Sequence, residues 1–349
     1  MTRTLPTWAR RTLAATLCCL GLAGASAQVG LQPLKWSLPQ ADGQPGEVPG
    51  MVWYPSAAPA QTLRFGPFEM HATLGAPATP GRHPLVLISH GTGGNELGHA
   101  WLAEKLAAEG YVVVALRHGG DNYQDRSGVG RADYFVQRPR QVSQVLDAVL
   151  ADPRWAALID ARRIALVGHS AGGYTALALA GGQPDRAAVA RHCSREGIGL
   201  RDDAAMCRLG GFTLDKPSPL PQGPAGELPV TRDPRVRAVL ALAPLGQPLA
   251  PASLAAVALP VMIDYSARDE VLAAGFHGGA LCQAMPRAKC RRDNDAGHFA
   301  PFQPGTGPLG GPGLDPAFDP AGFDRAAWQA AAWPRWRDFL ASALGRADS

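Results

Sequence analysis

The stretch Arg163-Ile-Ala-Leu-Val-Gly-His-Ser-Ala-Gly-Gly-Tyr174 joins an apolar run to a segment of helix-forming residues. Residues 164–167 are apolar and partly β-branched, which predicts a buried strand. The segment after Gly173 is rich in alanine and leucine, which favours a helix. Between them, Gly168-His-Ser-Ala-Gly172 fits the pattern G-x-S-x-G in the strand–turn–helix setting where that pattern presents a serine nucleophile.

The two glycines of this pattern have a steric role. A strand that turns sharply into a helix strains the residue in the middle, and side chains two positions away on either side would collide. Gly168 and Gly172 remove those side chains. We therefore expect Ser170 to stand clear of the backbone at a helix N-terminus. The alternative is that the turn is only structural and the serine incidental.

The first 27 residues resemble a targeting segment more than part of a fold. They contain three arginines and a short apolar run at 13–25, and they end in Ala25-Ser-Ala27. This arrangement is typical of a cleaved signal peptide, and the apolar run is too short to span a membrane. We expect a signal peptide at 1–27 and an exported domain at 28–349, periplasmic or secreted.

The composition argues against nucleic-acid and membrane partners. The chain has 349 residues, of which 46% are hydrophobic and 18% charged, which is typical of a globular enzyme. Loss of residues 1–27 removes three arginines and no acid, so 30 basic and 29 acidic side chains remain, a formal net charge of +1. A near-neutral protein has no electrostatic basis for binding nucleic acid or an anionic membrane. We expect a monomer without stable membrane insertion.

Four cysteines follow the signal peptide, namely Cys193, Cys207, Cys282 and Cys290. An even number in an exported chain predicts disulfides. Three pairings are possible, and we favour the local pairs Cys193–Cys207 and Cys282–Cys290 because both flank insertions. A metal site is the alternative, but the spacings lack C-x-x-C and no histidines cluster, so we expect no metal.

Apolar strands alternate with helical segments along most of the chain. Residues 85–89 and 111–116 are continuous apolar runs, and an amphipathic helix at 97–109 lies between them, which predicts a right-handed β-α-β unit. Further strands are expected at 48–55, 235–243 and 259–266, and further helices at 139–150 and 324–344. This alternation predicts an α/β fold with a doubly wound, mostly parallel sheet.

Two regions depart from the alternation. Residues 183–233 are polar, rich in proline and glycine, and contain one cysteine pair. We interpret them as a disulfide-bearing cap insertion over the active face of the sheet. Residues 28–81 look irregular and are expected to supply edge strands, including a short pair within 62–74.

A serine nucleophile needs a base to accept its proton and an acid to orient that base. In this fold class the order along the chain is Ser, then Asp or Glu, then His. A last strand is expected to follow the turn at Cys282–Cys290 and to run toward Asn294, and His298 lies in the loop after it. His192 lies in the insertion and His277 in an expected helix. His298 is therefore the candidate base.

The candidate acid is Asp269, which comes one short turn after the strand at 259–266. A carboxylate in that position can reach the base. Glu270 is the alternative, one position further on. Asp264 lies inside the strand and is expected to point into a face of the sheet.

The oxyanion of an acyl-transfer reaction needs two backbone N–H donors. One would come from Ala171, directly after Ser170, and the other from Thr92 in the glycine-rich loop 90–94. The glycines let this loop approach a substrate closely. The loop lacks the P-loop lysine and the spacing G-x-G-x-x-G, which argues against a phosphate cradle.

Three motifs together resemble those of the α/β-hydrolase superfamily: Ser89-His-Gly-Thr-Gly-Gly94, Gly168-His-Ser-Ala-Gly-Gly173 and Asp295-Ala-Gly-His-Phe299. Within it, the pattern is similar to the exported "predicted dienelactone hydrolase" group, which is related to platelet-activating-factor acetylhydrolases. The resemblance covers most of residues 48–344. It implies a nucleophile, an acid, a base and two oxyanion donors at Ser170, Asp269, His298, Thr92 and Ala171.

The sequence departs from both named groups at one position each. Dienelactone hydrolases proper use a cysteine nucleophile, whereas this chain has Ser170. In the acetylhydrolases the acid follows an earlier strand, which corresponds here to 236–243. That strand ends in Ala243-Pro-Leu-Gly246 without a carboxylate, which favours Asp269.

These observations predict an exported serine hydrolase that cleaves carboxylic esters through an acyl-enzyme. Its substrate would be a small-molecule or lipid ester, and the resemblance implies no metal or organic cofactor. The alternatives are a lipase, a phospholipase or a polyester hydrolase. A non-catalytic binding protein with the same fold is an alternative of a different class.

Overall fold

The structure, a computed structural model, describes residues 28–40, 43–131, 133–185, 187–219, 226, 228–305, 307, 309, 315–317 and 319–345. The signal peptide predicted at 1–27 lies outside these residues. Within the described part of the chain, ten strands form one sheet in the order β10-β9-β8-β7-β5-β6-β2-β1-β4-β3.

The centre of the sheet is parallel. Its strands are β6 (Val112–Leu116), β5 (His83–Ser89), β7 (Ile159–His169), β8 (Val236–Leu242), β9 (Val261–Ser266) and β10 (Lys289–Asp293). The apolar runs of β5 to β9 are buried, which explains why their sequences are continuous and do not alternate. The predicted doubly wound α/β architecture is confirmed.

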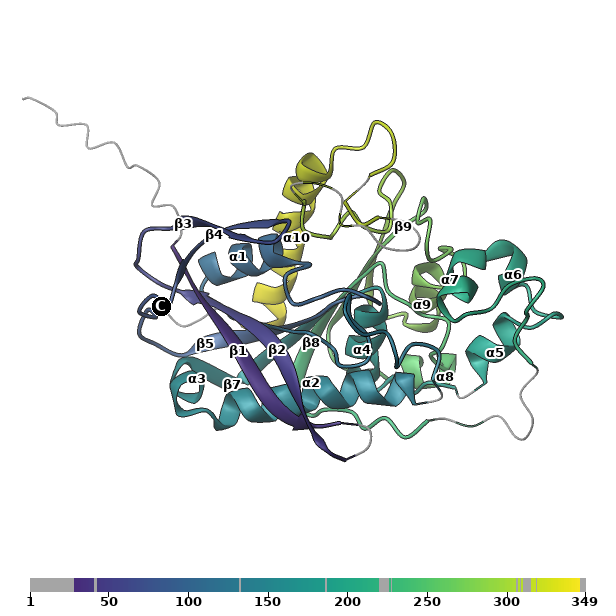
Figure 1. The fold of residues 1–349 in the computed structure, drawn as a ribbon, viewed down its shortest axis with the longest axis horizontal. Coiled ribbons are helices and arrows are strands. Elements are labelled where there is room, and N and C mark those ends of the chain that lie inside the picture. The colour runs from purple at the N-terminus through teal and green to yellow at the C-terminus, as the bar shows by residue number, and fades with distance from the viewer. Residues whose placement is uncertain are drawn as a thin grey trace, which may run out of the picture.

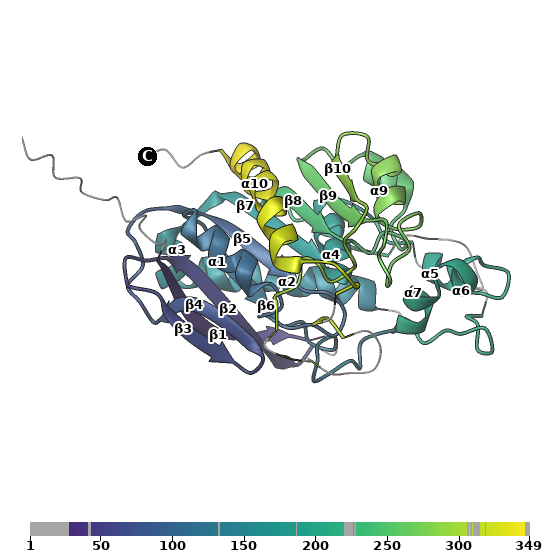
Figure 2. The ribbon, with the colours of Figure 1, turned by 90° about the horizontal axis from the view of Figure 1, so that it is seen from above.

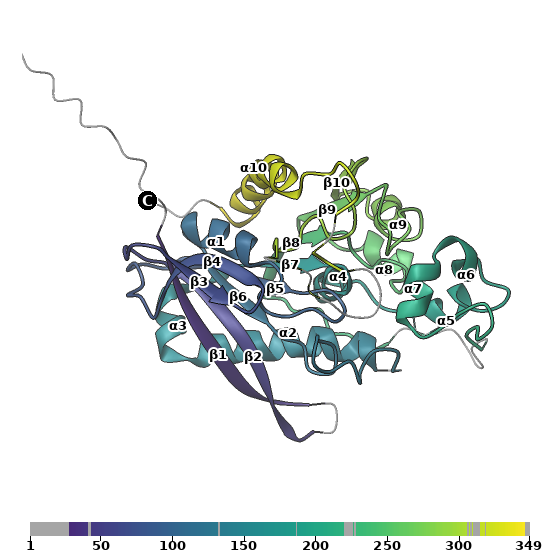
Figure 3. The same cartoon turned by 45° about the horizontal axis from the view of Figure 1, so that its top comes forward.

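The N-terminal strands extend the sheet with antiparallel pairs. β1 (Val29–Pro39) pairs with β2 (Pro45–Pro55) over its whole length, and β2 pairs with β6. β4 (Phe68–Leu74) lies beside β1 and pairs with β3 (Gln61–Phe65). Figure 3 shows the long β1–β2 ribbon projecting beyond the rest of the sheet. β1 is more regular than the sequence suggested, because its pairing with β2 outweighs the prolines at Pro33 and Pro39.

Helices cover both faces of the sheet, as Figures 1 and 2 show. One face carries α1 (Ala100–Ala108) and α10 (Arg325–Leu344); the other carries α2 (Tyr134–Ala151), α3 (Pro153–Leu158), α4 (Ala171–Ala180), α8 (Pro251–Ala255) and α9 (Gly278–Ala284). Each face therefore has its own apolar core. α2 begins five residues before the predicted start at 139 and includes Arg138.

The described residues of the insertion at 183–233 form three short helices, α5 (Ala188–His192), α6 (Gly199–Asp202) and α7 (Ala204–Leu209). In all three ribbon views they lie together at the end of the molecule opposite β1–β4, near α9 (Figures 1–3). Disulfides join Cys193 to Cys207 within the insertion and Cys282 to Cys290 between α9 and β10. These are the two local pairs that the sequence predicts.

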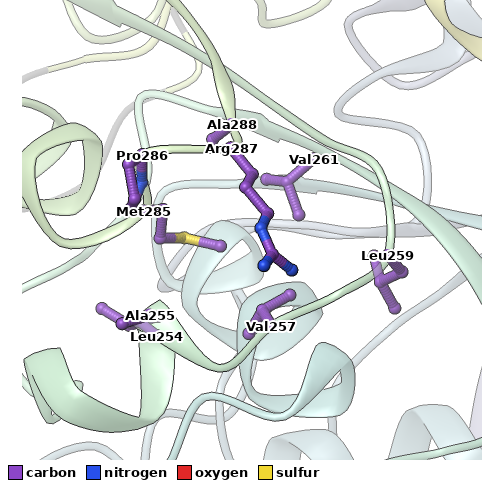
Figure 4. A pocket seen from close by; sticks show the side chains of 9 residues that line it. All are labelled: Leu254, Ala255, Val257, Leu259, Val261, Met285, Pro286, Arg287 and Ala288. Carbon is purple, nitrogen blue, oxygen red and sulfur yellow. The ribbon is translucent and has the colours of Figure 1, made fainter.

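Residues of α8 line a larger and a smaller cavity. The larger, about 520 Å³, is lined by residues of α5, α8 and α9. The smaller, about 10 Å³, has room for roughly one water molecule. Figure 4 shows Arg287 pointing into it beside Val257. Neither cavity is lined by Ser170, Asp269 or His298.

Candidate active site

The turn between β7 and α4 holds Ser170 in a strained backbone conformation. Its φ is 57° and its ψ −120°, a combination that residues with a side chain rarely adopt. A Cβ atom on Gly168 would lie 2.0 Å from the carbonyl oxygen of Gly172, and one on Gly172 would lie 1.9 Å from that of Ser89. Because these neighbours are backbone atoms that cannot move aside, both positions of the motif require glycine.

Hydrogen bonds to the end of β8 hold this turn in place. The N–H of Ser170 donates to the carbonyl oxygen of Leu242 at 3.0 Å, and the N–H of Leu245 donates to that of Ser170 at 3.0 Å. Ala243, between the two contacts, has a φ of 41°, in the left-handed region. The carboxyl end of β8 therefore holds the strained serine through both its N–H and its carbonyl oxygen.

His298 and Asp269 form a buried pair. Nδ1 of the His298 ring lies 2.7 Å from Oδ2 of Asp269, and their side chains are only 2% and 4% exposed. The other carboxylate oxygen, Oδ1, accepts hydrogen bonds from the N–H groups of Val271 and Leu272, which orients Oδ2 toward the ring. Burial alone would lower the pKa of His298, but the charge and hydrogen bond of Asp269 outweigh it and raise this pKa above its usual value.

The neighbouring carboxylate, Glu270, contacts the backbone of the same histidine. Its Oε2 accepts a hydrogen bond from the N–H of His298 at 2.9 Å. Asp269, and not Glu270, therefore contacts the imidazole. Asp264 accepts hydrogen bonds from Arg335 and Trp336 of α10, as expected for a carboxylate on a face of the sheet.

His169, the residue before Ser170, connects the serine turn to His298. Its Nε2–H donates to the carbonyl oxygen of His298 at 2.9 Å, and the two ring centroids are 4.9 Å apart. Burial lowers the pKa of His169 well below its usual value, so its ring is neutral. Through this contact His298 lies beside the turn that carries Ser170.

The glycine-rich loop 90–94 packs against the same turn. A Cβ atom on Gly91 would lie 3.0 Å from Cβ and 3.5 Å from Oγ of Ser170. Ala171 is the first residue of α4, and the first N–H groups of a helix have no intrahelical acceptor. The two predicted oxyanion donors, Thr92 and Ala171, thus belong to segments that meet at Ser170.

A buried polar network behind this loop was missed in the sequence. Arg138 of α2 donates hydrogen bonds to the carboxylate of Asp121 and to the carbonyl oxygen of His90. A charged residue on the buried side of a helix could have indicated such a network. The predicted helix began at 139, however, so Arg138 was left outside it.

His192 and His277, the rejected candidate bases, contact one carboxylate in the insertion. Oδ2 of Asp203 lies 2.9 Å from Nε2 of His192 and 2.7 Å from Nε2 of His277, and Oδ1 accepts from the N–H of Ala273 at 3.0 Å. Burial would raise the pKa of Asp203, but the two histidine hydrogen bonds outweigh it and hold this pKa well below its usual value. These contacts anchor the insertion to the segment that follows Asp269.

Across the described ranges, no three His, Cys, Asp or Glu side chains are grouped so that they could hold a metal ion. None of the helices in the same ranges is both long and apolar enough to cross a bilayer.

Comparisons with known proteins found partial similarities. The model of the chlorophyllase family matches residues 68–190. Cutinase est1 of Thermobifida alba is 33% identical over 174 residues, which cover 45% of this chain and 55% of that protein. Cutinase est2 of the same organism is 35% identical over 115 residues, covering 32% of this chain and 35% of that protein. The chain thus spans about half, or less, of the length of these relatives.

Among solved structures, a ferulic acid esterase from Streptomyces cinnamoneus is similar over 93% of both chains, with a TM-score of 0.58 and 18% identity. Similarity at that level of identity concerns the fold. The narrower resemblance to the dienelactone hydrolase group stays a prediction. The fold, the serine turn and the partial matches to cutinases and to the chlorophyllase family agree on one assignment: the chain has the α/β-hydrolase fold.

Proposed function

We propose that the protein is an exported serine hydrolase that cleaves carboxylic esters through a Ser170–His298–Asp269 triad. The main support is the buried His298–Asp269 pair, 2.7 Å apart, beside a strained serine turn. The cutinase names of its partial relatives favour an ester as the scissile bond. Two disulfides favour an oxidising compartment and therefore export.

In the proposed reaction, Oγ of Ser170 attacks the ester carbonyl carbon while Nε2 of His298 accepts the hydroxyl proton. Asp269 accepts the hydrogen bond from Nδ1–H, so that the lone pair of the ring is on Nε2. The oxyanion that forms accepts hydrogen bonds from the N–H groups of Thr92 and Ala171.

Collapse of this tetrahedral intermediate breaks the bond to the leaving alcohol. His298 returns its proton to the alkoxide oxygen, and the alcohol departs from an acyl-serine ester. Water then attacks the acyl carbon as His298 accepts a proton from it. Breakdown of the second intermediate releases the carboxylic acid and restores the hydroxyl of Ser170.

The test is hydrolysis of p-nitrophenyl acetate and labelling by a fluorophosphonate, which reacts with activated serines. Ser170→Ala and His298→Asn should each lose at least about 10³-fold in kcat/KM, because the members of a triad act as a unit. His71→Asn is the matched control, since His71 is an exposed histidine on β4. It should keep wild-type activity.

Two outcomes would contradict the proposal. Hydrolysis that persists in Ser170→Ala would exclude the serine mechanism. A wild-type protein that neither reacts with the fluorophosphonate nor cleaves esters of graded acyl length would favour the binding-protein alternative.

A further inference from the structure

We propose that Arg138 is a positioning residue that sets the separation between the two oxyanion donors, Thr92 and Ala171. This inference rests on the proposed function, because it concerns the oxyanion site of that reaction. Its basis is that one guanidinium group contacts the segments of both donors, directly on one side and through a single hydroxyl on the other.

On the loop side, Arg138 holds the start of the glycine-rich loop. Its Nη2 donates to the carbonyl oxygen of His90 and, at 3.3 Å, to the hydroxyl of Ser89. His90 lies two residues before Thr92. A shift of the guanidinium would therefore shift the loop that presents the Thr92 N–H.

On the helix side, Arg138 reaches the first residue of α4. Its Nε donates to Oγ1 of Thr175 at 3.1 Å, and the hydroxyl of Thr175 donates to the carbonyl oxygen of Ala171 at 2.9 Å. The chain of contacts from the carbonyl group of Ala171 to the loop thus contains one threonine hydroxyl and one guanidinium.

Asp121 and Tyr134 complete the link to Thr92. Oδ1 of Asp121 accepts from the N–H of Gly93 at 2.8 Å, and Oδ2 accepts from Arg138 and from the hydroxyl of Tyr134, the latter at 2.7 Å. Tyr134 has one hydroxyl proton and donates it to Asp121. The hydroxyl of Thr92, 3.0 Å away, must then be the donor to Tyr134. Burial and the charge of Asp121 raise the pKa of Tyr134, which keeps its hydroxyl protonated.

The alternative is that Arg138 and Asp121 are only a structural ion pair. Each side chain is 2% exposed, and buried ion pairs are weak evidence for stability because desolvation offsets their attraction. This pair differs from a purely structural one because Arg138 also contacts the loop 90–94 and, through Thr175, the first residue of α4. A guanidinium presents five N–H donors in a rigid plane, so it can hold acceptors on separate segments at fixed spacing, which a lysine ammonium cannot do.

The experiment compares an ester with its thionoester analogue, in which sulfur replaces the carbonyl oxygen. Sulfur accepts hydrogen bonds poorly, so the thionoester depends less on the oxyanion donors. Arg138→Lys and Thr175→Val should lower kcat for the ester about 10- to 100-fold, as expected for displaced donors, and leave KM nearly unchanged. The ester-to-thionoester rate ratio should fall as well.

Arg335→Gln is the matched control. Arg335 also pairs with a buried aspartate, Asp264, but from α10 on the other face of the sheet. Its loss should lower the melting temperature and leave the rate ratio at the wild-type value. Thr175→Val keeps the shape of a fully buried side chain, so it decides the question if Arg138→Lys does not fold.

Three results would overturn the inference. One is a folded Thr175→Val or Arg138→Lys protein with a wild-type rate ratio. Another is an ester-to-thionoester rate ratio that falls as much in Arg335→Gln as in Arg138→Lys. The third is a loss that appears in KM alone. Failure of the proposed function is seen separately, as ester hydrolysis that persists in Ser170→Ala.

Discussion

Glu270 and His298 are joined through the backbone: Oε2 of Glu270 accepts the hydrogen bond of the His298 N–H at 2.9 Å. The preceding residue, Asp269, contacts the ring of the same histidine at 2.7 Å. Two consecutive carboxylates therefore hold one histidine, Asp269 by its ring and Glu270 by its backbone N–H. Asp269 controls the tautomer of the ring, and Glu270 controls the path of the chain that carries it.

This division predicts unequal effects of two isosteric substitutions. Asp269→Asn should lower kcat for p-nitrophenyl acetate by about 10⁴-fold, because an amide no longer selects the required tautomer. Glu270→Gln should cost less than about 10-fold, since the amide oxygen still accepts the backbone N–H. Steady-state kinetics of both variants would check this. A loss in Glu270→Gln as large as in Asp269→Asn would contradict the division.

The pH profile of kcat/KM should report the raised pKa of His298. The ring must be neutral to accept the serine proton, so activity is lost as the pH falls through this pKa. Because Asp269 raises it, the acid limb should lie above the usual imidazole value of about 6.5. In Asp269→Asn the residual activity should have its acid limb at lower pH. A limb that stays in place would indicate another titrating group.

Two other buried histidines predict a loss of stability in acid. Burial, followed by the charge of Arg138, lowers the pKa of His90 to about 4; burial lowers that of His99 to about 3. Unfolding restores both pKa values to about 6.5, so the unfolded chain binds more protons below that pH. The contribution of each histidine to the free energy of unfolding is therefore complete above pH 6.5. Below pH 6.5 it falls by about 1.4 kcal/mol for each pH unit, until the pH reaches the pKa of that histidine in the folded protein.

His99→Leu provides the check on that prediction. Neither ring nitrogen of His99 has a hydrogen-bond partner among the described residues, so no side-chain hydrogen bond is lost with the ring. Urea unfolding at pH 7.5 and pH 5 should show a smaller pH dependence for this variant than for the wild type. An unchanged dependence would mean that His99 does not titrate on unfolding.

Gly172→Ala should be severely destabilising. Its Cβ atom would lie 1.9 Å from the carbonyl oxygen of Ser89, so the first turn of α4 and the end of β5 would have to separate. We expect a loss of about 3 kcal/mol or more. Gly275→Ala is the control, since a Cβ atom there meets nothing within 4 Å and should change stability by less than about 1 kcal/mol. Thermal unfolding of the two variants would distinguish them.

The two disulfides should contribute unequally to the free energy of unfolding. Cys193 and Cys207 are 14 residues apart, whereas Cys282 and Cys290 are 8 apart. Replacing the first pair by alanine should cost about 3 kcal/mol, and the second pair somewhat less, because a longer loop restrains the unfolded chain more. Denaturant unfolding of each double variant, with the reduced wild type for reference, would measure this. A larger loss from the second pair would contradict the loop-length argument.

The sequence predicted features that depend on neighbouring residues, such as the serine turn. It left open features that depend on packing, such as the orientation of the Asp269 side chain. The serine turn could be predicted because Gly168 avoids a clash with Gly172 inside the same five-residue motif. The expected order Ser170, Asp269, His298 follows from the succession of strands. The choice between Asp269 and Glu270 depends on a turn in which Oδ1 caps the N–H groups of Val271 and Leu272. Sequence spacing does not encode that orientation.

Other features of the structure depend on contacts between distant segments. Arg138 contacts Asp121, 17 residues away, and Thr175, 37 residues away, so no motif joins them. β1 contains Pro33, which disfavours a strand, and is stabilised by its register with β2. The pairing of His298 with Asp269 was therefore more predictable than the contacts that Arg138 makes behind the loop 90–94.

Asp203 binds a disulfide-closed insertion to Ala273 and His277, a few residues beyond Asp269. Heat that loosens the insertion should therefore disturb the Asp269 turn while the sheet stays intact. Thermal inactivation would then precede the cooperative melting of secondary structure.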